Sequence, residues 1–173
     1  MSRWDITGIN IMKKLYVLLL FTATFSILFA QETTIKKTVW VDLALPSGTL
    51  WAEDPEEGYY TYDEAKEKYG AQMPTRWQWN ELYESCEVEK IYTKDIKGVL
   101  FTGKNGNSIF IPAKGGNILG GKKPSGVDKD QVLYWAFSTC FYDITKAYVM
   151  QAAEPQFWPN KKSGRFPVIL VNK

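Results

Sequence analysis

The stretch TYDEAKEKYGAQMPTRWQWNELYESC, residues 61–86, contains two helix starts in succession. Glu64 follows Thr61 by three positions, and Gln78 follows Thr75 by the same spacing. Each pair has the form of a capping box, in which the threonine hydroxyl accepts a backbone N–H and the later side chain reaches back. We therefore predict two consecutive helices, each beginning at its threonine.

We expect the first helix to end at Gly70. The second helix has one apolar face. Four of its residues recur at helical spacing and should face the core: Trp79, Leu82, Tyr83 and Cys86. Glu81 and Glu84 lie off this stripe, so we expect both carboxylates to face water. No helical period follows Cys86.

The rest of the chain reads as strands joined by turns. We predict strands at 38–45, 49–52, 99–102, 108–111, 133–139, 147–153 and 166–171, with an edge segment within 154–164. The last strand is apolar on both faces, which indicates a central position. Asn105-Gly106 between apolar runs predicts a type I′ hairpin turn, with positive φ at both residues.

The segment Ala113–Gln131 is a long loop with five glycines and no phosphate-binding motif. Loops of this length in compact domains are usually functional or mobile. We expect this one to have no structural role, so that a short Gly-Ser linker could replace it with little loss of stability.

The N-terminus has the parts of a secretory signal peptide. Two lysines precede an apolar run at 15–30, so we interpret residues 12–30 as the signal, with cleavage near Ala30-Gln31. Residues 1–11 are interpreted as an upstream start artefact and residues 31–173 as one domain. An uncleaved membrane anchor is the alternative. Export would place the protein in the periplasm, at the cell surface or outside the cell, with membrane contact only during export.

Composition excludes several function classes. The chain has no histidine, which removes histidine-dependent catalysis and histidine-ligated metals. Its net charge of +2 provides no basic field for nucleic acid. The acidic loop Glu53–Gly58 is either a calcium site or a solvated loop, and its spacing is not that of an EF-hand. We therefore predict no enzyme, no cofactor and no metal site.

Two strings are similar to a known family. Val41–Ala52, VDLALPSGTLWA, resembles the opening of the Fibrobacter succinogenes major paralogous domain family of secreted Bacteroidetes proteins, and Thr102–Pro112, TGKNGNSIFIP, resembles its hairpin. The resemblance extends over roughly 39–171. It implies a C-type-lectin-like α+β fold, with two helices packed beside twisted antiparallel sheets and a long glycine-rich loop. It also implies a cell-envelope context, and it implies no reaction.

These observations favour an exported, non-enzymatic binding or adhesion module for a glycan or protein partner. A structural envelope component and a carboxylate-dependent hydrolase are the alternatives. The long loop and a late aromatic should border the binding surface, through Lys122, Lys123, Asp128, Asp130 and Trp158. Cys86 and Cys140 are either bridged, as export permits, or both free.

Overall fold

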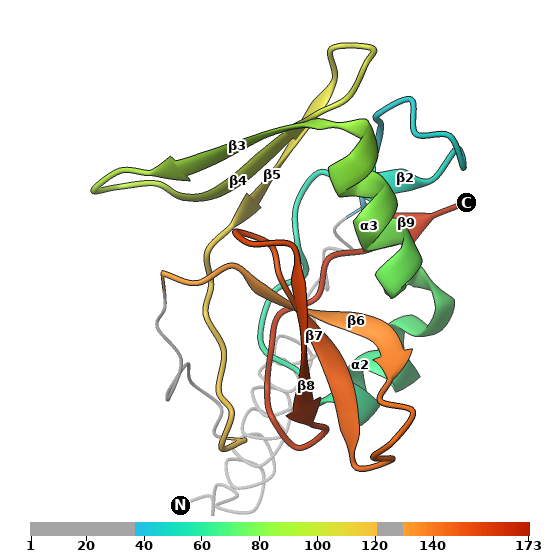
Figure 1. Ribbon diagram of the computed structural model, residues 1–173, viewed down its shortest axis with the longest axis vertical. Coiled ribbons are helices and arrows are strands. Elements are labelled where there is room, and N and C mark those ends of the chain that lie inside the picture. The colour runs from blue at the N-terminus through green and yellow to red at the C-terminus, as the bar shows by residue number, and fades with distance from the viewer. Residues whose placement is uncertain (1–36, 121–129) are drawn as a thin grey trace, which may run out of the picture. The chain divides into compact units, whose positions relative to one another are not determined.

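The computed structural model describes residues 37–120 and 130–173, and all of these except Lys37 belong to one compact unit that runs from Thr38 to Lys173. It is an α+β fold with two short helices and three antiparallel sheets (Figure 1). Among the described residues, the buried apolar side chains form one cluster between Leu43 and Val171, so this unit carries a core of its own. The expected signal peptide and residues 1–11 lie outside the described residues.

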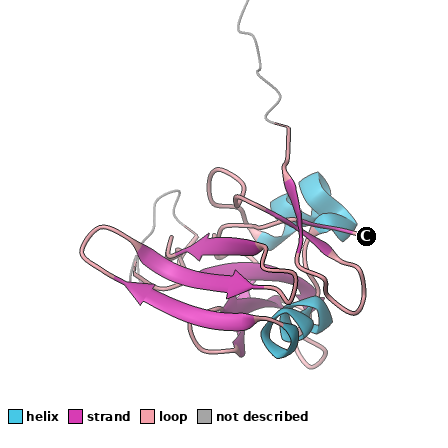
Figure 2. Cartoon of the chain, turned by 90° about the horizontal axis from the view of Figure 1, so that it is seen from above, coloured by secondary structure: helices cyan, strands magenta, loops and turns pink. Residues whose placement is uncertain are grey.

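Each sheet has three strands. Their orders are β1-β2-β9, β3-β4-β5 and β6-β7-β8. The elements are β1 (Trp40–Asp42), β2 (Leu50–Ala52), α2 (Tyr62–Tyr69), a 3-10 turn (Gly70–Gln72), α3 (Arg76–Ser85), β3 (Glu87–Tyr92), β4 (Lys97–Thr102), β5 (Ser108–Pro112), β6 (Leu133–Thr139), β7 (Lys146–Gln151), β8 (Gln156–Lys161) and β9 (Val171–Asn172). Seen from above, both helices lie away from the free end of the β3–β4 hairpin (Figure 2).

Both predicted capping boxes are present. The Thr61 hydroxyl accepts the Glu64 backbone N–H, and the Glu64 carboxylate accepts the Thr61 N–H at 2.9 Å. Thr75 and Gln78 exchange the same pair of hydrogen bonds at the start of α3. Gly70 ends α2 with a φ of 51°, as its position predicts. Local chemistry therefore sets the start of each helix.

One face of α3 is buried as expected, but the prediction for Glu81 is wrong. Trp79 and Leu82 are fully buried, and Glu84 is exposed. Glu81 is only 6% exposed, because its carboxylate accepts hydrogen bonds from the backbone N–H and the hydroxyl of Ser47, at 2.7 and 2.6 Å. The carboxylate thereby holds the turn between β1 and β2 against the helix.

β1 ends earlier than the apolar pattern predicts. Ala44 has a φ of 53°, and its N–H donates to the Asp42 side chain at 2.8 Å, which turns the chain out of the strand. The side-chain amides of Asn105 and Asn107 both donate to the Asp42 carbonyl at 2.8 Å. The β4–β5 turn therefore fixes the end of β1.

The β4–β5 turn differs from the predicted type I′ form. Only Gly106 has a positive φ, 84°, while Asn105 does not. Gly106 donates to the Gly103 carbonyl at 3.0 Å, and Gly103 donates to the Asn107 carbonyl at 2.8 Å. This arrangement fits a turn followed by one left-handed glycine, the next most common kind of short hairpin. The strand β3, which the pattern does not predict, pairs with β4 along its whole length.

Replacing Gly106 by valine should therefore lower the free energy of unfolding by about 1–2 kcal/mol, through backbone strain alone. A Cβ at this position would meet open space, so no clash contributes. Chemical denaturation is the measurement. An unchanged midpoint would show that the turn does not need positive φ at this residue.

The segment 166–171 is central, as predicted, but it is not a regular strand. Its residues are buried, and its carbonyls accept hydrogen bonds on two sides. Tyr60 donates to Phe166 and Ala52 donates to Leu170, while Trp135 donates to Pro167 from β6. Pro167 has no N–H to complete a ladder. Only β9 at its end forms a strand.

The expectation that the whole long loop lacks a structural role is wrong for its first part. Asn117 is 3% exposed, and its backbone exchanges hydrogen bonds with Arg165 at 2.7 and 2.8 Å. A Cβ at Gly116 would lie 2.3 Å from the Phe166 ring. The segment 113–117 therefore packs against the core, and replacing all of 113–131 should destabilise the fold. Residues 121–129 lie outside the described part.

Candidate functional site

A groove of about 640 Å³ lies on one face of the β6-β7-β8 sheet. It is lined by Ile118, Gln131, Leu133, Val149, Gln151, Glu154, Trp158, Pro159, Asn160 and Phe166. These residues come from all three strands of the sheet, from the two described ends of the long loop, and from the buried segment that begins at Phe166. The groove is thus assembled from parts of the chain that are distant in sequence.

Strand alternation explains which residues face the groove. Trp158 of β8 lies opposite Val149 of β7, and Leu133 of β6 lies opposite Gln151. Cross-strand partners project to the same face of a sheet, so these four side chains share one surface. Neighbouring residues such as Met150 project to the other face and enter the core. Val149 and Leu133 are buried and form an apolar floor.

Phe166 is fully buried at the base of the groove. Its ring meets Trp135 edge to face, with ring centroids 4.9 Å apart. Gly116 lies directly against the ring, which leaves no space for any side chain on that residue. This contact sets the path of the loop so that Ile118, two residues later, reaches the groove. The base is therefore rigid and apolar.

The rim of the groove is polar and carries one exposed aromatic. Trp158 is 53% exposed. Around it lie three side-chain amides, Gln131, Gln151 and Asn160, and the carboxylate of Glu154. Within the described residues, these amides make no hydrogen bond to the rest of the chain. An indole face beside unpaired amides can stack on a ligand and exchange hydrogen bonds with it.

The lining residues favour a neutral polar ligand. Among the described lining residues there is no Lys or Arg, so an anionic ligand has no obvious partner there. Glu154 is the one carboxylate among the described lining residues, whereas glycoside hydrolysis ordinarily uses a pair. In the part of the chain that the structure describes, no group of three or more acidic or cysteine side chains could hold a metal. Over the same residues, no helix has the length and apolarity to cross a bilayer.

The structure does not bring all of the predicted site residues together. Trp158 lies at the rim of the groove. Asp130 precedes the lining residue Gln131, but its carboxylate forms an ion pair with Lys97 of β4. Lys122, Lys123 and Asp128 lie outside the described residues. The place of these three residues at the binding surface therefore remains a prediction.

Of the two alternatives for the cysteines, the structure has both thiols free. Cys86 follows the last residue of α3. The end of β6, near Cys140, lies beside the opposite end of this helix, because Phe137 donates to the Pro74 carbonyl at 2.9 Å. A helix of 10 residues is about 15 Å long, which exceeds the reach of a disulfide.

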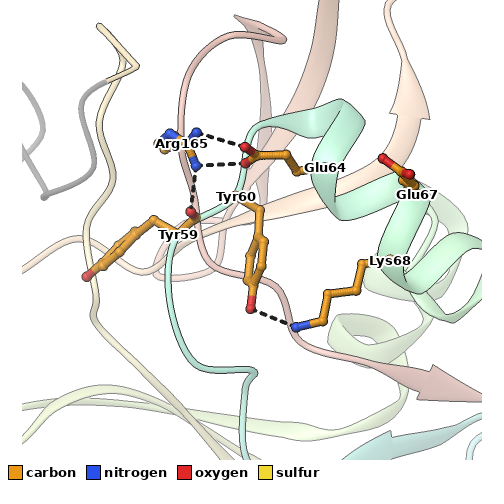
Figure 3. A pocket seen from close by; sticks show the side chains of 6 residues that line it. All are labelled: Tyr59, Tyr60, Glu64, Glu67, Lys68 and Arg165. Atoms are coloured by element: carbon orange, nitrogen blue, oxygen red, sulfur yellow. Dashed lines mark hydrogen bonds and ion pairs between the residues drawn. The ribbon is translucent and has the colours of Figure 1, made fainter.

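A second hollow, of about 540 Å³, is lined by Tyr59, Tyr60, Glu64, Glu67, Lys68 and Arg165 (Figure 3). Its polar groups are largely paired with one another. Arg165 binds both oxygens of Glu64, at 2.7 and 2.8 Å, and also donates to the Tyr59 carbonyl. The hydrogen bonds from Arg165 and from the Thr61 backbone hold the pKa of Glu64 below its usual value. The polar groups of this hollow therefore join α2 to the segment at Arg165 and have a structural role.

The groove amides are the functional candidates that sequence reasoning missed. Gln131, Gln151 and Asn160 have no motif spacing, and only strand register brings them to one face. The polar positions on that face of β7 and β8 are the one signal that could have indicated them. Comparisons with protein-family models, with curated proteins and with solved structures find no match to this chain.

Proposed function

We propose that this protein is an exported, non-enzymatic binding module and that the groove around Trp158 is its ligand site. The observation that carries the proposal is the exposed indole at the rim of a concave surface whose side-chain amides have no hydrogen-bond partner among the described residues. Pockets with an apolar base and a few convergent polar groups are the usual form of ligand sites. Export rests on the apolar segment at 15–30.

The ligand class that suits the lining best is a neutral glycan. A sugar ring has an apolar face that can stack on an indole, and hydroxyls that can pair with amides and a carboxylate. A protein partner at the cell envelope is the second candidate, because an exposed tryptophan is also a common anchor at protein interfaces. A purely structural envelope role would leave the unpaired amides without use.

We also propose the C-type-lectin-like fold and membership of the Fibrobacter succinogenes major paralogous domain family. The two strings that resemble the family lie against each other. The hairpin amides of Asn105 and Asn107 bind the Asp42 carbonyl, and Gly103 packs on the backbone of Leu43. Packing at this contact is a physical reason for both strings to occur in one chain. This contact supports the proposed fold. It does not involve the groove in which we propose that the ligand binds.

Replacing Trp158 by alanine should lower glycan affinity at least about tenfold, because the exposed indole supplies the stacking surface of the proposed site. The probe is an array of neutral oligosaccharides, followed by calorimetry on the best binder. Trp77→Ala is the matched control, since Trp77 is 59% exposed and does not line the groove. Failure of the unaltered protein to bind any glycan, or equal loss in both variants, would contradict the proposal.

A further inference from the structure

The loop between β6 and β7 exposes three large apolar side chains within four residues. Phe141 is 88% exposed, Tyr142 is 62% exposed and Ile144 is 82% exposed. They lie at the end of the β6-β7-β8 sheet, at the turn between the tip of β6 and the start of β7 (Figure 1). None of the three lines the groove around Trp158. We refer to residues 141–144 as the apolar tip.

The backbone of the apolar tip is held in place by hydrogen bonds. Cys140 donates to the Lys146 carbonyl and Lys146 donates to the Asp143 carbonyl, both at 3.0 Å. The Asp143 carboxylate accepts the backbone N–H and the hydroxyl of Thr145, at 3.0 and 2.6 Å. The rings of Phe141 and Tyr142 pack edge to face, with centroids 5.0 Å apart. The apolar side chains are therefore presented to solvent by an ordered loop.

Lysines gather at the base of the tip. Lys146 at the start of β7 lies directly opposite Lys161 at the end of β8, and Lys162 donates its backbone N–H to the Thr145 carbonyl. Like charges directly opposite one another destabilise a sheet. Asp143 forms an ion pair with Lys146 at 3.0 Å. In the described part of the chain, neither Lys161 nor Lys162 forms a salt bridge, although the Lys162 ammonium lies over the Tyr62 ring, 5.6 Å from its centroid.

We propose that the apolar tip docks this protein on a lipid membrane that contains anionic headgroups. Phe141, Tyr142 and Ile144 would enter the boundary between headgroups and acyl chains, where aromatic side chains are favoured. Lys161 and Lys162 would lie at the level of the headgroups, where each basic residue adds attraction to an anionic surface.

The size of the tip favours a membrane over a protein partner. A stable protein interface covers roughly 800 Å² on each partner. Four residues at the end of a hairpin offer only a small part of that area, whereas shallow insertion needs no extended surface. The inference does not depend on the groove or on its ligand, and it extends beyond membrane contact during export.

The test uses the unit Thr38–Lys173, which carries its own core and lacks the apolar segment at 15–30. It is sedimented with phosphatidylcholine vesicles that contain or lack phosphatidylglycerol. We expect binding to the anionic vesicles. The double variant Phe141→Ser with Ile144→Ser should bind them at least about tenfold more weakly, because it loses two inserted apolar side chains. Lys161→Gln with Lys162→Gln should weaken binding to anionic vesicles by roughly tenfold.

Leu119→Ser is the matched control, because Leu119 is 82% exposed, like Ile144, but lies in a different loop. It should bind as the unaltered protein does. The proposal is overturned if the unaltered protein binds no vesicle, if the tip variant binds as well as the control, or if the control loses as much. A dimer that the tip variant dissociates, without vesicle binding, would identify the tip as a self-association surface instead.

Discussion

Replacing Trp79 by alanine is expected to lower the free energy of unfolding by about 3–5 kcal/mol, the range for deleting a buried tryptophan. Trp79 is fully buried and lies where α3 meets two sheets. Its ring centroid is 4.9 Å from that of Trp51 in β2 and 6.4 Å from that of Tyr134 in β6. Truncation would remove contacts with both sheets at once and leave a cavity.

Denaturant unfolding followed by circular dichroism measures the effect. Trp158→Ala is the control, because it makes the same chemical change at a half-exposed position and should alter stability by less than about 0.5 kcal/mol. Trp79→Phe should cost less than Trp79→Ala. In the described residues the Trp79 indole N–H has no hydrogen-bond partner, so none is lost. Equal midpoints for Trp79→Ala and Trp158→Ala would contradict the central position of Trp79.

Replacing Gly103 by alanine should destabilise the protein by about 3 kcal/mol, near the upper end for a side chain forced into a packed site. The added Cβ would lie 2.2 Å from the Leu43 carbonyl oxygen and 2.8 Å from the Leu43 Cα. Both are backbone atoms. The Asp42 carbonyl beside them is held by two asparagine amides, so the backbone has little freedom to move away.

Thermal and denaturant unfolding of Gly103→Ala should be compared with Gly106→Ala in the same turn. The Gly106 variant has strain but no clash, and about 1 kcal/mol is expected. A larger loss for Gly106→Ala than for Gly103→Ala would mean that the hairpin does not pack on β1 as the structure has it.

Features set by local chemistry could be predicted from sequence. Each helix start follows from a threonine and a residue three positions later, and these bonds do not depend on the rest of the fold. The type of the β4–β5 turn was harder to predict, because Asn105-Gly106 suits two kinds of hairpin. The choice between them depends on the asparagine amide, which binds the distant Asp42 carbonyl.

Features set by distant contacts could not be predicted. Glu81 is buried because a serine 34 positions earlier supplies two donors. β3 has the sequence EVEKIY, in which most side chains are exposed. This sequence lacks the apolar run that would predict a strand, although β3 pairs with β4. The groove likewise depends on distant contacts. Trp158 could be selected from sequence as a late-loop aromatic, but the amides beside it are brought there by the fold.

The order of strands in the first sheet bears on when the domain can fold. β2 lies between β1 and β9, and Trp51 pairs with Val171, which follows it by 120 positions (171 − 51). While the ribosome is still making the protein, β2 has no second neighbour, and the apolar residues 166–171 are absent from the core. Long-range pairing of this kind must wait for both partners. The core of this unit therefore cannot close before residues 166–171 have been made, although both helices and β2 precede them by about 80 residues or more.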